Sequence, residues 1–458
     1  MEDLVREKLT ERIINLVDNK KFGELKSILN DLNPFDVAQI LEELKDNQIP
    51  VAFRLLSKSI ASDTFVEMST DSQETLLNSF TDAELKTVFD DMFLDDTVDI
   101  IEEMPAVVVK RIIKQSDPDI RKQINEILQY PEDSAGTIMT VEYVSLKKEW
   151  TVQKCFEQLR AQAVDKETIY TCYVTNAHRK LQGIVTVKDL LLAQSDTLVG
   201  DIMETSVISV TTTTDKEKVA EVASDYDLYA VPVVDTENRI VGIITIDDII
   251  DVIHEEATED ISKMAAVVPT DEEYLEQSVF TVWKSRVPWL LLLMVSATFT
   301  GLIINSFEHT LSLLSPLLFA CIPMLMGTGG NAGSQVCVTI TRALALDEVN
   351  FHDIGKIIWK ELRVSIFTAL TLAVACFAKL QLIDRLIFSY EYTVLISAIV
   401  SLALAFTIII AKLVGCCLPL IAKKCKLDPA VVANPFITTI VDALSLLVFC
   451  GVSIWLLS

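Results

Sequence analysis

The last stretch of the chain, "NPFITTIVDALSLLVFCGVSIWLLS" (residues 434–458), has the composition of a membrane-spanning helix and carries a single acidic residue. A helix crosses the hydrocarbon layer of a bilayer with about 20 apolar residues, which this stretch supplies. Asp442 lies near its middle, where an ionised carboxylate is costly and by default marks an ion or proton site facing the interior of a helix bundle. The alternative is a carboxylate hydrogen-bonded to Thr438 or Thr439, one turn earlier. We favour the ion site.

The charge of the chain is unevenly distributed. The 458 residues have a formal net charge of −26, yet residues 276–458 hold 12 Lys and Arg against 10 Asp and Glu. The sequence therefore predicts a strongly acidic soluble region followed by a nearly neutral apolar one, in several domains. Because an acidic surface repels phosphates, nucleic acid is not expected as a partner, whereas small cations are.

Cysteines and the N-terminus exclude two further classes. The nine cysteines show no CxxC spacing, which predicts small buried residues in a reduced compartment and no disulfide framework or zinc site. The start "MEDLVREKLTERII" is charged and amphipathic and does not resemble a cleavable signal peptide.

Residues 1–128 are predicted to form an all-α domain. "NPFDVAQILEEL", "TDAELKTVFDDM" and "DPDIRKQINEIL" each begin with an Asn, Thr or Asp cap and repeat apolar residues every three or four positions. Helices of about three turns separated by short caps are typical of helix pairs stacked into a superhelix. No catalytic constellation is present, so we expect a regulatory or scaffold domain with a solvated acidic surface.

A sequence repeat follows this helical domain. In each copy a β-type run ends in Gly-aliphatic-aliphatic-Thr-aliphatic-x-Asp and continues into a helix. The first copy contains "AGTIMT" and "LQGIVTVKDLL", and the second contains "VGDIMET" and "AVPVVDTENRIVGIITIDDII". The repeat resembles a tandem pair of cystathionine-β-synthase (CBS) domains, at 134–196 and 197–254. The resemblance implies α/β modules that bind nucleotides or ions and rarely catalyse reactions.

An acidic connecting helix is expected at 255–283, followed by a five-span α-helical transmembrane domain at 284–458. Hydropathy places the spans at 287–307, within 309–341, and at 360–382, 390–420 and 430–456. The loops after the second and fourth spans are basic, with Lys356, Lys360 and Arg363 near the first and "AKKCK" in the second. The positive-inside rule therefore puts the acidic region in the cytoplasm and the C-terminus outside, although Lys379 and Arg385 fall on the outer side.

The second span contains "PMLMGTGGNAGSQ" (residues 323–335), whose proline and four glycines weaken an ordinary helix. Small residues let helix backbones approach closely, so helix packing alone is one explanation. Asn331 and Gln335 add polar groups that lipid does not accommodate. We therefore favour a pore-lining segment that shares an interior with Asp442.

The ligand chemistry around Asp442 favours a hard divalent cation. Carboxylate, amide and carbonyl oxygens suit Mg²⁺ or Ca²⁺. Mg²⁺ keeps several waters around one or two carboxylates, which fits one Asp442 per chain if two chains meet on an axis. The cation between them would make the buried charge tolerable. Asp428, just before Pro429, has the spacing of an ordinary helix cap.

The whole chain resembles the MgtE family of magnesium channels and transporters. The resemblance is carried by the domain order and by "SAGTIMT", "PMLMGTGGNAGSQ", "TRALALDEV" and "LDPA", the last followed by Asp442. It implies a homodimer in the lipid bilayer of the cell membrane that imports Mg²⁺ through a pore on the two-fold axis. Asp442 would be the principal selectivity acid, and Gly329, Gly330 and Asn331 would line or shape the pore.

The same resemblance implies a Mg²⁺ sensor in the soluble region, where bound Mg²⁺ cancels carboxylate repulsion and favours a closed state. The matching positions are Asp95, Asp99, Asp215, Asp227, Asp248, Asp251, Glu256, Glu259 and Asp260. Asp91 or Asp96 could replace the two in the helical domain. Asp189 and Asp248 end the two CBS motifs where such modules hold a nucleotide ribose, so ATP is a further candidate ligand, and Asp248 is claimed by both sites.

Three other functions are less consistent with the residues. The nearest alternative is a carrier that couples a divalent cation to H⁺ or Na⁺, with Asp442 as the titrating site. A CBS-gated chloride channel would need basic residues in the pore. An intramembrane metalloenzyme would need HExxH, and "HEEAT" at His254 lacks the second histidine.

Overall fold

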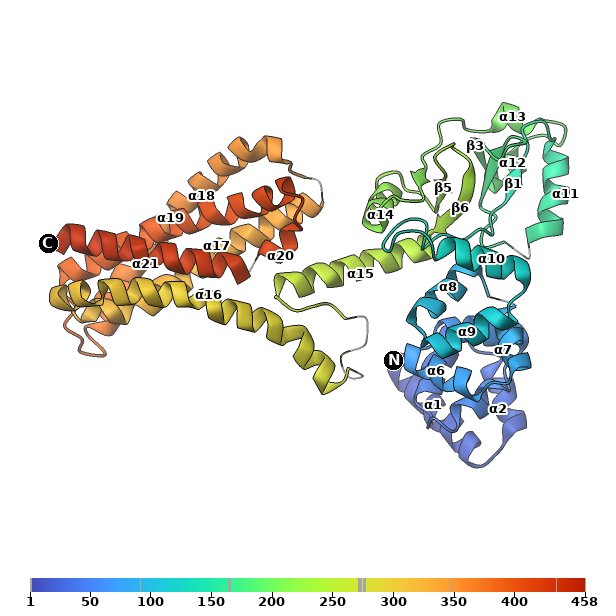
Figure 1. Ribbon diagram of the computed structural model, residues 1–458, viewed down its shortest axis with the longest axis horizontal. Coiled ribbons are helices and arrows are strands. Elements are labelled where there is room, and N and C mark those ends of the chain that lie inside the picture. Colours follow the sequence, from blue (N-terminus) through green and yellow to red (C-terminus); the bar gives the residue numbers. More distant parts are fainter. Residues whose placement is uncertain are drawn as a thin grey trace. The chain divides into compact units, whose positions relative to one another are not determined.

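The computed structural model describes residues 2–90, 92–163, 166–270, 274, 277–346, 348–433 and 435–457. The chain divides into two compact units, one that ends at Ile253 and one that begins at His254. The first unit contains short helices and two small sheets, and the second contains long helices (Figure 1).

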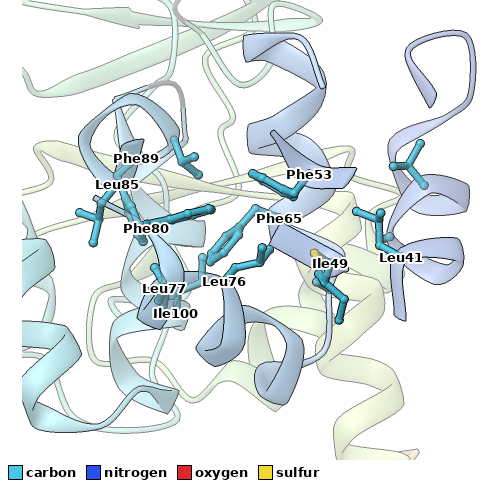
Figure 2. Packing of buried hydrophobic residues seen from close by; sticks show 14 of the residues in the cluster. Leu41, Ile49, Phe53, Phe65, Leu76, Leu77, Phe80, Leu85, Phe89 and Ile100 are labelled. Carbon is cyan, nitrogen blue, oxygen red and sulfur yellow. The ribbon is translucent and has the colours of Figure 1, made fainter. Parts of the chain in front are cut away.

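The first unit opens with ten short helices in its described residues. They are α1 (Glu2–Asp18), α2 (Phe22–Leu29), α3 (Pro34–Glu42), α4 (Ile49–Phe53), α5 (Lys58–Val66), α6 (Thr70–Ser79), α7 (Asp82–Phe89), α8 (Leu94–Glu103), α9 (Ala106–Gln115) and α10 (Pro118–Ile127). Helices two apart in the sequence pack together: α2 on α4, α3 on α5, α4 on α6, α5 on α7, α7 on α9 and α8 on α10. This alternation is the superhelical stacking that short capped helices predict. Phe53, Phe65, Phe80 and Phe89 pack in the core between them, with ring centroids 5.5 to 6.3 Å apart (Figure 2).

Two of the three expected caps in this unit close their helices. The Asn33 side chain accepts a hydrogen bond from the Phe35 N–H at 3.0 Å, and Thr81 forms a reciprocal capping box with Glu84. Asp117 precedes α10 but makes no cap bond, and its carboxylate accepts from the Lys86 ammonium at 3.0 Å. Pro118 opens α10 and has no N–H, so this helix end has one fewer donor to satisfy.

Two three-stranded sheets complete the first unit. The elements of the first copy are β1 (Ser145–Leu146), α11 (Val152–Gln162), β2 (Thr171–Thr175), β3 (Leu181–Thr186) and α12 (Val187–Leu192). After α13 (Val199–Ile202), the second copy has β4 (Val210–Thr211), α14 (Lys216–Asp225), β5 (Ala230–Val234) and β6 (Ile240–Thr245). In both sheets the first strand pairs in parallel with the second, and the second pairs antiparallel with the third. The repeated topology is that of the repeated sequence.

Steric crowding explains why each repeat motif has a glycine at this position. A Cβ at Gly183 would lie 2.7 Å from the carbonyl oxygen of Glu204, and one at Gly242 would lie 2.6 Å from that of Thr140. Another segment of backbone therefore crosses each strand where only glycine leaves room.

Helix α15 (Ile246–Met264) is shorter and begins earlier than the connecting helix expected at 255–283. It ends because Ala266 adopts a left-handed conformation (φ 57°) and the Val267 N–H donates to the Ser262 carbonyl at 3.0 Å, a bond that closes the helix end. Residues 279–283 belong to the next helix, and residues 271–273 and 275–276 lie outside the described part of the chain.

The second unit is built from long helices. They are α16 (Val279–Leu314), α17 (Leu317–Ala345), α18 (Ile354–Ala378), α19 (Val394–Lys424), the short α20 (Pro429–Ala433) and α21 (Pro435–Leu457). A 3₁₀ turn at Phe351–Asp353 precedes α18, and a π-helical turn at Lys379–Asp384 follows it. In the described residues α19 packs against α17, α18 and α21, and α16 packs against α21 (Figure 1).

Four stretches of helix in the described residues are long and apolar enough to cross a membrane. They are Val279–Leu314, Phe351–Asp384, Val394–Lys424 and Phe436–Leu457. The second of the five expected spans, within 309–341, is occupied by α17, whose 29 residues are long enough to cross. It does not count among the four because the glycines, Asn331, Ser334 and Gln335 lower its apolar content.

Candidate ion pathway and acidic cluster

Glycines bring α17 into close contact with α19 and α21. A Cβ at Gly415 of α19 would overlap the carbonyl oxygen of Gly333 of α17. A Cβ at Gly329 would lie 2.7 Å from Thr407 Cγ2 and 2.8 Å from Ser445 Oγ. The three helices approach this closely only because these positions lack side chains. Gly329, one of the residues expected at the pore, is therefore buried in a helix contact.

Asp442 lies half-buried on α21, beside the glycine segment of α17. A Cβ built at Gly330 would lie 3.8 Å from Asp442 Oδ1. Asp442 makes no hydrogen bond or ion pair with any residue that the structure describes. Thr439 instead faces the Ser296 hydroxyl of α16, at 3.3 Å. The carboxylate is thus not the partner of a neighbouring threonine, and its charge is available to a cation.

One face of α17 remains exposed in the single chain. Pro323, Gly327, Asn331 and Gln335 are exposed at four-residue spacing, while Gly329, Gly330 and Gly333 are buried. Residues four apart form a continuous stripe along a helix. Asn331 therefore belongs to a polar stripe that no other described residue of this chain covers.

A cluster of carboxylates gathers in the first unit where α8 and the start of α15 meet a loop of the first CBS copy. Burial, followed by repulsion from Asp248, Asp96 and Glu167, raises the pKa of Asp95 to about 9. Burial and the neighbouring acids Asp248 and Asp247 raise the pKa of Asp96 to about 7. Asp95 is only 6% exposed, so water screens its charge little.

Glu167 and Asp248 complete this group of acids. We call the four residues Asp95, Asp96, Glu167 and Asp248 the acidic cluster. Burial followed by repulsion from Asp96 raises the pKa of Glu167 to about 8. Its Oε2 is buried and has no hydrogen-bond partner among the described residues. Burial raises the pKa of Asp248 to about 6 against the hydrogen bonds from Thr245. No three His, Cys, Asp or Glu side chains in the described chain stand close enough to hold a metal ion directly.

Several other expected sensor acids lie outside this cluster. Asp99, one turn after Asp95, is exposed. Asp215 caps α14 by accepting from the Glu217 N–H at 3.0 Å, and Asp227 occupies a left-handed turn (φ 53°). Asp251 is exposed on α15, where it adds to the effect of burial in raising the pKa of Glu67 and of Asp248, a member of the cluster. Asp91 lies outside the described residues.

The two nucleotide candidates have a local structural role. The Thr186 N–H donates to Asp189 Oδ2 at 3.1 Å, and the Thr245 hydroxyl donates to Asp248 Oδ2 at 2.7 Å. Each Thr-x-x-Asp motif thus closes a helix start at the end of a strand. Asp189 is exposed, whereas Asp248 also belongs to the acidic cluster.

In the second unit, the end of α15 is held on the membrane helices. Lys263 forms ion pairs with Glu259 at 2.7 Å and with Asp428 at 2.8 Å. Burial and Asp428 raise the pKa of the adjacent Asp260. Met264 packs against Cys337, Ala411, Ile437 and Val441, the last next to Asp442. Glu256, an expected sensor acid one turn before Asp260, is half-buried.

Sequence reasoning missed Glu167, Asp247 and Lys263 and gave Asp428 only a capping role. Asp428 does cap α20, since its Oδ1 accepts from the Ala430 N–H at 2.8 Å, but it also binds Lys263. Glu167 is a lone acid in a loop, and nothing in its local sequence distinguishes it from a solvated one.

A half-buried acid inside a bundle of long apolar helices, joined to tandem CBS modules, defines a multi-pass membrane transport protein with regulatory domains. A family model described as a divalent cation transporter matches residues 322–452, the MgtE intracellular N domain matches 32–133, and CBS domains match 135–196 and 199–255. The chain belongs to the MgtE family.

Individual relatives match along almost the whole chain. It is 34% identical to the magnesium transporter MgtE of Thermus thermophilus over 98% of both chains, and 32% identical to that of Bacillus subtilis over 99% of this chain and 98% of the relative. A crystal structure of the soluble part of a magnesium transporter covers 55% of this chain and 99% of its own, with 30% identity and a TM-score of 0.52. The expected fold class is confirmed, with four spans meeting the apolar criterion in the described residues.

Proposed function

We propose that this protein is a channel that imports Mg²⁺ across the cell membrane and closes when internal Mg²⁺ is high. One observation carries the proposal: Asp442 is a half-buried carboxylate in a membrane helix without a protein partner among the described residues. An ionised acid in this position calls for a cation or a water-filled pathway that compensates its charge. The names of the relatives, magnesium transporters, support Mg²⁺ as that cation.

The pore forms between two copies of the chain. The exposed stripe of Pro323, Gly327, Asn331 and Gln335 on α17 is too polar for lipid and needs a second surface or a water-filled path. A two-fold axis beside it would bring two Asp442 carboxylates around one hydrated Mg²⁺. Light scattering of the detergent-solubilised protein should give the mass of two 51.0 kDa chains, and a monomer mass would contradict the dimer.

The soluble domains face the cytoplasm and sense Mg²⁺ there. Burial and then mutual repulsion raise the pKa values of Asp95, Asp96 and Glu167, and a divalent cation would relieve the repulsion. Because no ligand cage is preformed in the described residues, a hydrated ion suits the cluster better than a dehydrated one. Glu256, Glu259, Asp260 and the further acids Asp99, Asp215, Asp227 and Asp251 would extend the charged interface. Neutralising Glu256, Glu259 and Asp260 together should leave flux uninhibited at high internal Mg²⁺.

ATP is a regulatory ligand of the CBS pair in this proposal, with Asp189 rather than Asp248 facing the ribose. Asp189 is exposed, whereas Asp248 is engaged with other carboxylates, whose charge disfavours a nucleotide. Titration calorimetry should give weaker ATP binding in Asp189→Asn, and unchanged binding would remove Asp189 from the site.

The pore assignment is tested by Asp442→Asn in proteoliposomes loaded with a Mg²⁺ indicator. We expect Mg²⁺ influx to fall to the level of empty liposomes while the unfolding temperature changes little. The matched control is Glu308→Gln, which removes an exposed carboxylate from α16 and should keep wild-type influx. Normal influx through Asp442→Asn would overturn the proposal. Single-channel currents that reverse at the Mg²⁺ equilibrium potential would exclude the coupled carrier.

A further inference from the structure

Lys412 is a lysine inside the membrane unit whose side chain is mostly buried. It lies within α19 and is only 6% exposed. It forms no hydrogen bond or ion pair with any residue that the structure describes. Lys423, at the end of the helix, is about 16 Å away along the axis, so Lys412 cannot reach the surface at that end.

The neighbours of Lys412 on α19 show where its side chain lies. Cys416, one turn later, packs with Val336 and Ile340 of α17 and with Ile357 of α18. Ile408, one turn earlier, belongs to a cluster that also contains residues of α17 and α18. Residues four apart share a helix face, so Lys412 lies on the face of α19 that packs against α17 and α18.

The backbone of α19 beside Lys412 lies close to the Asp442 site. Gly333 of α17 contacts the carbonyl oxygen of Ala411, the residue before Lys412. Gly330, one turn earlier on α17, faces Asp442 Oδ1. The backbone beside Lys412 and the Asp442 carboxylate thus touch adjacent turns of the same helix, from α19 and α21 respectively.

The charge of Lys412 is not cancelled within the described chain. Glu361 of α18 interacts electrostatically with Cys416, yet it forms no ion pair with Lys412 within 4 Å. An uncancelled charge acts electrostatically beyond the atoms that it touches.

We propose that Lys412 is a specificity-determining residue that weakens divalent binding at the Asp442 site enough for Mg²⁺ to leave. The inference rests on the proposed pore role of Asp442. A conducting site must bind its ion strongly enough to admit it and weakly enough to release it. The field of one fixed positive charge opposes Mg²⁺ twice as strongly in free energy as it opposes Na⁺, so its main effect is on the divalent ion.

The test is Lys412→Met in proteoliposomes, with two readouts. One is the external Mg²⁺ concentration that half-saturates influx, and the other is the inhibition constant of Na⁺ against that influx. If removing the charge lowers the half-saturating Mg²⁺ concentration about tenfold, the inhibition constant of Na⁺ should fall about threefold. The reason is that the change in binding free energy is twice as large for the divalent ion as for the monovalent ion. Maximal influx should fall as release slows.

Two control variants separate charge from packing. Lys412→Arg keeps the charge and should stay within about twofold of wild type in both constants. Lys360→Met removes an exposed cation of α18 and should change neither. Unchanged constants in Lys412→Met, or equal fold changes for Mg²⁺ and Na⁺, would overturn the inference. The Asp442→Asn variant separates failure of this inference from failure of the proposed pore. Normal influx through Asp442→Asn would contradict the pore role of Asp442, whatever the Lys412 variants show.

Discussion

Single glycines have different roles in the membrane unit according to what surrounds them. Gly415 faces the backbone of Gly333, so neither position has room for a methyl group. Gly301 of α16 has open space around it, and a side chain there meets no atom of the chain. Identical residues in similar apolar helices therefore differ in their structural importance, and only the neighbouring helix distinguishes them.

Gly415→Ala should destabilise the membrane unit by about 1–3 kcal/mol, because the new methyl forces α17 and α19 apart. The thermal unfolding midpoint in detergent, followed by size-exclusion chromatography, measures the change. Gly301→Ala is the control and should leave the midpoint unchanged or slightly higher, because alanine favours a helix over glycine. Equal midpoints for the two variants would contradict the close contact.

At the scale of elements, helix ends decide which charges meet. α15 stops at Met264 because the backbone turns left-handed at Ala266, and this leaves Lys263 in the last turn of the helix. There it bridges Glu259 of its own helix and Asp428 before α20. A tethered ammonium thus partly neutralises acids that the proposal assigns to Mg²⁺ sensing.

Lys263→Met should raise the internal Mg²⁺ concentration that half-inhibits influx several-fold. Without the ammonium, Glu259, Asp260 and Asp428 repel one another, and Mg²⁺ must compensate more charge before α15 stays on the membrane helices. Influx at graded internal Mg²⁺ measures the effect. Lys263→Arg should behave as wild type, and so should Lys284→Met, an exposed lysine of α16. An unshifted inhibition curve for Lys263→Met would show that the ion pairs do not contribute.

At the scale of the whole molecule, folding of the first unit is linked to protons and cations. Asp95, Glu167 and Asp96 have folded-state pKa values of about 9, 8 and 7, above their ordinary values of 3.8, 4.5 and 3.8. Raised values mean that the folded state holds protons more tightly than the unfolded state. Stability from this source is complete below about pH 4 and is lost as the pH rises through 7 to 9.

Mg²⁺ should therefore stabilise the first unit more at high pH than at low pH, since it replaces protons that have left the acidic cluster. Calorimetry of the full chain at pH 6 and pH 9, with and without Mg²⁺, measures the shift of the first-unit transition. We expect a larger upward shift at pH 9. In the double variant Asp95→Asn/Glu167→Gln, the Mg²⁺-induced shift of the first-unit transition should depend less on pH. A shift of the same size at both pH values in the unaltered chain would contradict a cluster that exchanges protons for Mg²⁺.

Local patterns in the sequence determined the order of the elements, the repeated α/β modules and the apolar helices. They also placed Asp442 within a membrane span, because periodicity, caps and composition act over a few residues. The tertiary structure alone decided that Glu167 meets Asp96 and Asp248, that Lys263 bridges to Asp428, and that Lys412 lies buried beside the glycine contact. These side chains are far apart along the chain. Their contacts depend on how helices and loops pack, which no local pattern encodes.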